Sequence, residues 1–109
     1  MKYFCIVRRL AASGPRAANE VAREAALDEL RRSGQLLAAA TLEPSGAGVL
    51  VRVRAGHASV AVAVPDDCLG LEAFFVLEAR DLNEAIHLAA RDPGARHGQV
   101  EVRPLRSFG

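Results

Sequence analysis

Strand-like and helix-like segments follow one another along this chain in an order that few folds accommodate. Read from the N-terminus, the hydrophobic patterns predict a strand, a helix, a strand, a hairpin, a strand, a helix and a final strand. The chain has 109 residues, enough for one domain with a single core. Two strand–helix–strand halves around one sheet, with both helices on the same face, predict a ferredoxin-like α+β sandwich that spans residues 1–109.

The first half of the sandwich is predicted from the N-terminal residues. Residues 2–10 are rich in aromatic and β-branched side chains that alternate between two faces, which is typical of a strand. A helix is expected from Arg16 to Ser33, because Gly34 supplies the left-handed residue that ends many helices. Residues 35–42 fit a buried strand or an extension of this helix, and the stop at Gly34 favours the strand. The buried face of the helix is predicted to be an alanine-rich arc of Ala18, Ala22, Ala25, Ala26 and Leu30.

A hairpin and a central strand are predicted in the middle of the chain. Residues 49–54 and 59–64 alternate in polarity around the tight turn Ala55-Gly56, which is typical of a hairpin. Residues 71–80 are apolar on both faces, as in a strand that is covered on both sides. The sheet face without helices would otherwise be an exposed apolar patch, so we expect a homodimer in which a second subunit covers it.

A second helix and a last strand complete the pattern. Asp81 followed by Glu84 has the spacing of a capping box, which predicts a helix start. The helix is expected to continue to Asp92, where Pro93-Gly94 stops it. Its apolar stripe is predicted to be Leu82, Ala85, Ile86 and Ala89. Residues 99–103 alternate again and predict a strand that ends at Pro104.

Composition excludes several classes of function. Lys+Arg 14 against Asp+Glu 13 gives a net charge of +1, so no basic field would attract nucleic acid or an anionic membrane. The two cysteines lack the spacing of a zinc or redox motif and the density of a secreted scaffold, so a cytoplasmic protein is expected. We expect no metal and no nucleotide cofactor, since neither a ligand cluster nor a glycine-rich phosphate loop is present. The apolar runs are too short for a signal peptide or a membrane span.

Several fragments, in this order and spacing, resemble the YCII-related or DGPF-domain family. The most specific is the closing Val100-Glu101-Val102-Arg103-Pro104. The others are Met1-Lys2-Tyr3, Arg31-Arg32-Ser33-Gly34, Val51-Arg52-Val53-Arg54-Ala55-Gly56, Phe74-Phe75-Val76-Leu77-Glu78 and Asp81-Leu82-Asn83-Glu84-Ala85. The resemblance covers nearly the whole chain. It implies a dimeric α+β barrel, in which two ferredoxin-like subunits pack sheet against sheet.

The chain departs from the family's pattern at its namesake motif. Asp-Gly-Pro-Phe should follow the second hairpin strand, but residues 60–68 read Val-Ala-Val-Ala-Val-Pro-Asp-Asp-Cys. The resemblance also implies a His and Asp pair in the pocket, which this chain does not supply through the namesake motif. Asp66 or Asp67 stands in by position only, because no residue matches the motif itself.

Asp66, Asp67 and His57 are the candidate catalytic residues. Adjacent acids in a turn usually hydrogen-bond local backbone amides, but one placed over a pocket could act as a general base. His57 follows the hairpin turn, where it is either an exposed residue or the partner of that base. The other histidines are expected on the surface, His87 on the polar side of its helix and His97 in a loop. Cys5 and Cys68 are expected to be small buried side chains.

Arg8 and Arg52 are the candidate ligand anchors. They project from strands, and a guanidinium binds a carboxylate in a bidentate way. The alternative, which we prefer, is cross-strand pairing with Glu43, Glu78 or Glu101.

Two functions remain open at this stage. The first is a small-molecule-binding or accessory protein that has lost the family's acid–base pair, and the missing motif favours it slightly. The second is a metal-independent enzyme that performs proton transfer, elimination or isomerisation on an aromatic or lactone-like metabolite. The sequence decides neither whether the protein is an enzyme nor the identity of its ligand.

Overall fold

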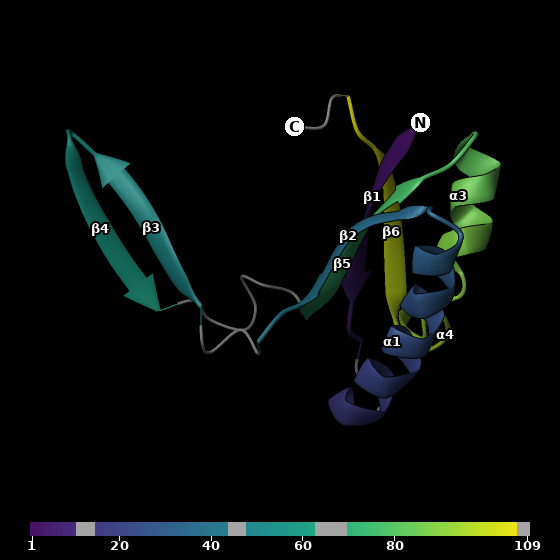
Figure 1. Cartoon of the computed structure of the whole chain (residues 1–109). Helices are drawn as coiled ribbons and strands as arrows, with labels where there is room; N and C mark the ends of the chain where they lie inside the picture. Colours follow the sequence, from purple (N-terminus) through teal and green to yellow (C-terminus); the bar gives the residue numbers. More distant parts are fainter. Residues whose placement is uncertain (11–14, 44–47, 63–69, 107–109) are drawn as a thin grey trace.

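A four-stranded antiparallel sheet with three helices on one face forms the body of the protein (Figure 1). The computed structural model describes residues 1–10, 15–43, 48–62 and 70–106. The sheet order is β2–β5–β1–β6, with strands β1 (Lys2–Arg8), β2 (Leu36–Thr41), β5 (Leu71–Glu78) and β6 (Gln99–Pro104). The helices are α1 (Arg16–Arg32), α3 (Leu82–Ala89) and α4 (Gly94–His97). This arrangement confirms the predicted ferredoxin-like α+β sandwich.

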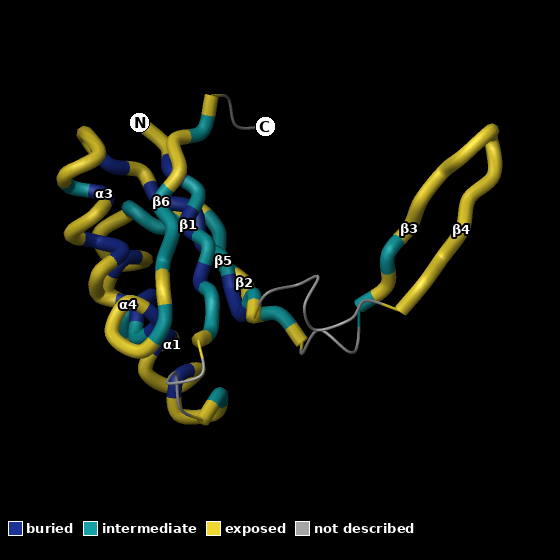
Figure 2. Tube along the Cα trace, turned by 180° about the vertical axis from the view of Figure 1, so that it is seen from behind, coloured by how far each residue is buried: buried dark blue, intermediate teal, exposed yellow. Residues whose placement is uncertain are grey.

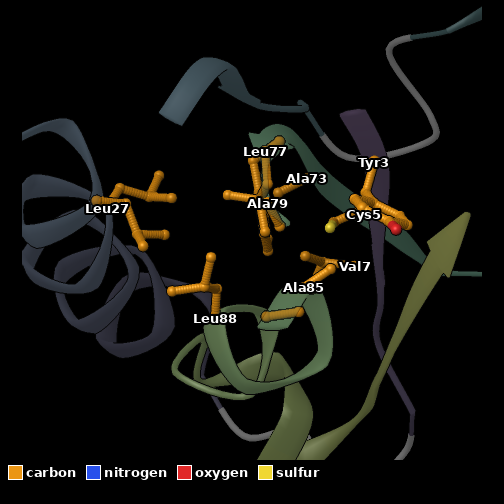
Figure 3. Packing of buried hydrophobic residues seen from close by; sticks show 12 residues of the cluster. Tyr3, Cys5, Val7, Leu27, Ala73, Leu77, Ala79, Ala85 and Leu88 are labelled. Atoms are coloured by element: carbon orange, nitrogen blue, oxygen red, sulfur yellow. The ribbon is translucent and has the colours of Figure 1, made fainter. Parts of the chain in front are cut away.

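The hydrophobic core lies between the sheet and the helices. Successive residues of a strand point to opposite faces, so Tyr3, Cys5 and Val7 of β1 share the helix-covered face and are buried. Figure 3 shows this strand across from Leu27 of α1 and Leu88 of α3.

Among the described residues, no helix is long and apolar enough to cross a bilayer.

The buried face of α1 differs from the predicted alanine arc. The residues that face the sheet are Asn19, Arg23, Leu27 and Leu30, whereas Ala18, Ala22 and Ala25 are exposed. Of the predicted arc, only Leu30 is buried, and Ala26 is half-buried. The prediction was wrong because it ranked positions by hydrophobicity, whereas Arg23 is buried through ion pairs with side chains of distant segments. At the C-terminal end, the prediction is confirmed, since Gly34 has a φ of +79°.

The second helix is shorter than predicted. It ends at Ala89, and the turn 90–92 leads into the short α4, which includes His97 instead of leaving it in a loop. The Asp92 carboxylate accepts a hydrogen bond from the Gly94 backbone N–H at 2.7 Å, which fixes this turn. The buried residues of α3 are Ala85, Leu88 and Ala89, while Leu82 and Ile86 of the predicted stripe are half-exposed at 47% and 48%.

The predicted helix cap at Asp81 is confirmed. Its side chain accepts a hydrogen bond from the Glu84 backbone N–H at 2.9 Å. We expect Asp81→Ala to lower the free energy of unfolding by about 1 kcal/mol, because the helix loses the acceptor for that amide. Urea unfolding followed by circular dichroism measures this change. An unchanged midpoint would show that water replaces the cap without cost.

The hairpin forms a separate two-stranded sheet. Strands β3 (Val49–Arg54) and β4 (His57–Val62) pair around Ala55 and Gly56, which have φ of 51° and 78°. Positive φ at both central residues is the geometry of the tight hairpin turn. Figures 1 and 2 show the hairpin apart from the body, on the side of the four-stranded sheet that carries no helix. The second strand begins two residues earlier than predicted, and Asp66, Asp67 and Cys68 lie outside the described residues.

Candidate functional site

A buried cluster of charges joins α1 to the sheet. The Arg23 guanidinium donates to Asp92 Oδ1 at 2.8 Å and to Glu72 Oε2 at 2.9 Å. All three side chains are at most 3% exposed. Arg9, which is 24% exposed, donates to the other Glu72 oxygen at 2.9 Å. Glu72 therefore bridges a buried and a partly exposed guanidinium.

The cluster keeps Glu72 and Arg23 ionised. Burial alone would raise the pKa of Glu72, but hydrogen bonds from Arg9 and Arg23 outweigh it and hold this pKa below its usual 4.5. Burial alone would lower the pKa of Arg23, but the hydrogen bonds and charges of Asp92 and Glu72 raise it above its ordinary value. Glu72 and Arg23 are therefore charged at neutral pH and are poorly suited to exchanging a proton with a substrate.

Cys5 lies on the core side of β1 and is fully buried. Burial, and next the charge of Asp92, raise the pKa of its thiol to about 12. The side chain is therefore a thiol at neutral pH, and its nucleophilic thiolate form is scarce. Cys5 behaves as a core residue, as the sequence predicted.

An open groove lies between α1 and the end of β2, beside this cluster. Its volume is about 480 Å³, and it is lined by Arg16, Glu20, Glu24, Thr41, Leu42 and Glu43. The groove adjoins the cluster through Leu42, whose backbone N–H donates to the Glu72 carbonyl at 2.8 Å. On the other side, Arg16 donates to the Leu42 carbonyl at 2.5 Å. The helix that buries Arg23 therefore also supplies the polar wall of the groove.

The groove offers mainly hydrogen-bond acceptors. Three carboxylates face one guanidinium, and Glu24 is engaged by Arg31 at 2.6 Å. Ionised carboxylates accept hydrogen bonds and do not donate them. The groove thus suits a ligand with several hydroxyl or amino donors, and it disfavours an anion.

Comparison with known proteins places the chain in a family. The model of the YCII-related domain matches residues 1–109. The chain belongs to the YCII-related domain family. Within the solved structures, this YCII-related domain is similar to a 5-chloro-2-hydroxyhydroquinone dehydrochlorinase from Burkholderia phenoliruptrix, determined in complex with 2,5-dihydroxybenzoquinone. The TM-score is 0.63 at 17% sequence identity, over 99% of this chain and 96% of that one, which shows a shared fold. No curated protein matches the sequence.

The predicted site residues of this YCII-related domain lie on two separate sheets. Arg52 and His57 share one face of the hairpin, because Arg52 pairs with Ser59, and His57 pairs with Arg54 in the next position on that face. Arg8 is on β1, where it donates to Glu101 of β6 at 2.8 Å. This is the cross-strand pairing weighed as the alternative for Arg8. Asp66 and Asp67 lie outside the described residues, so the structure brings together only Arg52 and His57.

The remaining histidines are on the surface. His87 is exposed, and its Nδ1 lies 2.8 Å from the Asn83 carbonyl oxygen. His97 is exposed at the end of α4. In the described part of the YCII-related domain, no group of His, Cys, Asp and Glu side chains could hold a metal ion.

Sequence reasoning missed the groove and the buried cluster. The sequence patterns pointed to neither Glu20 nor Glu24 as a site residue, and Glu43 was considered only as a pairing partner of arginines. The one available signal was spacing: Asn19, Arg23, Leu27 and Leu30 recur at helical intervals, which marks one face. A polar residue within that stripe was the sign of a buried ion pair.

Proposed function

We propose that this protein binds a small, uncharged, hydroxyl-rich organic molecule in the groove between α1 and β2. The observation that supports this most is the set of carboxylates that line the groove, Glu20, Glu24 and Glu43. Hydroxyl donors of a ligand would replace the water that these acceptors bind, and each such bond is charge-assisted. Arg16 provides a donor at the same site for a carbonyl or hydroxyl oxygen.

The size of the groove and the fold neighbour support the same class of ligand. About 480 Å³ lies within the range of roughly 300–1,000 Å³ that small-molecule sites occupy. The neighbour's substrate, 5-chloro-2-hydroxyhydroquinone, is a hydroxylated ring. A ring with several hydroxyl groups is therefore the first ligand to test.

The test is calorimetric titration of 2-hydroxyhydroquinone in oxygen-free buffer. We expect saturable binding to the wild type, and about tenfold weaker binding for Glu20→Gln and for Glu43→Gln, since each loses a charged acceptor. Glu29→Gln is the matched control, because Glu29 is an exposed glutamate of the same helix that does not line the groove. Absence of binding to the wild type, or equal affinity for Glu20→Gln, would contradict the proposal.

An anionic ligand distinguishes binding in this groove from binding at the predicted arginine anchors. At neutral pH, 2,5-dihydroxybenzoquinone is an anion, so we expect it to bind the groove more weakly than the neutral triol. If it binds more tightly and Arg52→Met abolishes that binding, the ligand site lies on the hairpin instead.

The second candidate is catalysis. Here Asp66 or Asp67 would be the base and His57 its partner, with Arg8 or Arg52 as anchor, in an elimination that needs no metal. Two observations favour it: Arg52 and His57 share a face, and the fold neighbour is a dehydrochlorinase. Chloride release from 5-chloro-2-hydroxyhydroquinone tests it, and the release should fall in Asp66→Asn or Asp67→Asn.

The protein is also proposed to act as a homodimer. The sheet face without helices carries Phe4 and Phe74, whose rings stack with centroids 5.4 Å apart. Ile6 of β1, which pairs with Phe74 of β5, lies on the same face. All three side chains remain partly exposed in the single chain. Burying them against the same face of a second copy would remove an apolar patch from water.

The proposed location is the cytoplasm. Cys5 is a free and buried thiol, which is the usual state of a cysteine in a reducing compartment.

A further inference from the structure

The hairpin has one face made entirely of apolar side chains. In an antiparallel pair, directly opposed residues point to the same face. Val51 opposes Val60, and the neighbouring pairs on that face are Val49 with Val62 and Val53 with Ala58. We call these six residues the valine face. On the opposite face, the apolar pair Leu50 and Ala61 is followed, toward the turn, by two polar pairs. These are Arg52 with Ser59 and Arg54 with His57.

The described part of the chain leaves the valine face uncovered. Its five valines are 59–67% exposed, and Figure 2 shows the hairpin as exposed along nearly its whole length. An isolated two-stranded hairpin is marginally stable in water, and a contiguous apolar patch on a soluble protein marks an interaction surface. A strand pair with one apolar and one largely polar face is built to be covered on the apolar side.

We propose that the valine face lies against a second copy of this chain, so that each hairpin is an arm that clasps its partner. This inference rests on the proposed dimer and adds to it the part of the molecule that holds the two copies together. The hairpin stands on the helix-free side of the sheet in both views, the side on which the partner is expected (Figures 1 and 2).

The surface area that a stable dimer must bury favours a second copy of this chain as the partner of the valine face. From strand dimensions, the helix-free face of four strands measures about 20 by 20 Å, and the valine face about 20 by 10 Å. Contact between the two sheet faces alone therefore has a flat footprint of about 400 Å² on each copy. Two arms, each covering an equal area of the partner, double this footprint, which brings the pair closer to the roughly 1,600 Å² of accessible surface that a standard interface buries.

Sedimentation equilibrium of Val60→Asp tests the arm, with Ser59→Asp as the matched control. Val60 is at the centre of the valine face, and Ser59 is the adjacent residue on the opposite face. We expect the wild type to have twice the mass of the 11.6 kDa chain. Val60→Asp should raise the dimer dissociation constant at least about 100-fold, because it buries a carboxylate without a partner. Ser59→Asp should change it by no more than about threefold, as for an ordinary surface substitution.

A milder variant protects the test against misfolding. Val60→Thr replaces one methyl group with a hydroxyl and should raise the dissociation constant about tenfold, while the circular dichroism of the helices stays unchanged in all variants. If Val60→Asp dimerises as tightly as the wild type, the hairpin does not clasp the partner, and the two copies are held together by their sheet faces alone. A monomeric wild type would overturn both, and a mass above two chains would overturn the closed pair. Ligand binding in the groove is measured independently and is affected by none of these outcomes.

Discussion

Replacing Arg23 with methionine is expected to lower the free energy of unfolding by about 3–5 kcal/mol, because two buried carboxylates lose their partner. Glu72 and Asp92 are at most 2% exposed, so water cannot solvate them in the folded state. Glu72 would retain Arg9, but the Asp92 carboxylate would keep only the Gly94 amide among its described hydrogen bonds. The loss is a large share of a typical domain stability of about 5–15 kcal/mol. Urea unfolding at neutral pH measures it.

Two further variants show whether the loss arises from buried charge. Arg31→Met removes a guanidinium of the same helix that pairs with Glu24 and Asp28 in solvent, and we expect its urea midpoint to match the wild type. The triple variant Arg23→Met, Glu72→Met, Asp92→Asn removes all three charges, so it should recover most of the stability lost by the single variant. If the triple variant is less stable than Arg23→Met alone, packing and not charge is what Arg23 contributes.

Acidification is expected to remove the contribution of Glu72. Its pKa is lower in the folded state than the usual 4.5 of an unfolded chain, because Arg9 and Arg23 stabilise the carboxylate. The unfolded chain therefore takes up the proton first as the pH falls. The contribution is complete above pH 4.5, and it is lost as the pH drops through the lower folded pKa.

Unfolding of Glu72→Gln at a series of pH values tests this assignment. The stability difference between wild type and Glu72→Gln should be largest at neutral pH and should shrink toward acid. The exposed control Glu29→Gln should stay parallel to the wild type over the same range. A difference between wild type and Glu72→Gln that does not change with pH would contradict the salt-bridge account.

Local patterns predicted the architecture well. The order of strands and helices follows from hydrophobic periods, and the cap at Asp81 and the stop at Gly34 depend on residues within one turn of the helix end. The hairpin turn at Ala55-Gly56 was predicted for the same reason. Such features need no information about distant parts of the chain.

The candidate site was largely unpredictable because it depends on distant partners. Arg23 is buried through Glu72 and Asp92, which lie 49 and 69 residues away in the sequence. Hydrophobic periodicity alone placed Arg23 on the solvent side of α1, and it therefore predicted that the alanines of α1 face the sheet. The groove likewise forms only when α1 and β2, which are separate segments of the sequence, pack beside each other. Of the candidate site residues, Arg52 and His57 share one face of the hairpin, because the two residues are close in sequence on paired strands.

The central claim is that a hydroxyl-rich ligand occupies the groove between α1 and β2. A crystal structure of the protein with 2-hydroxyhydroquinone, grown without oxygen, tests it most directly. We predict density for the ring in the groove, with its hydroxyl groups within hydrogen-bond distance of the Glu20 or Glu43 carboxylate. Density for the ring beside Arg52 and His57 on the hairpin, with the groove holding only water, would contradict the claim.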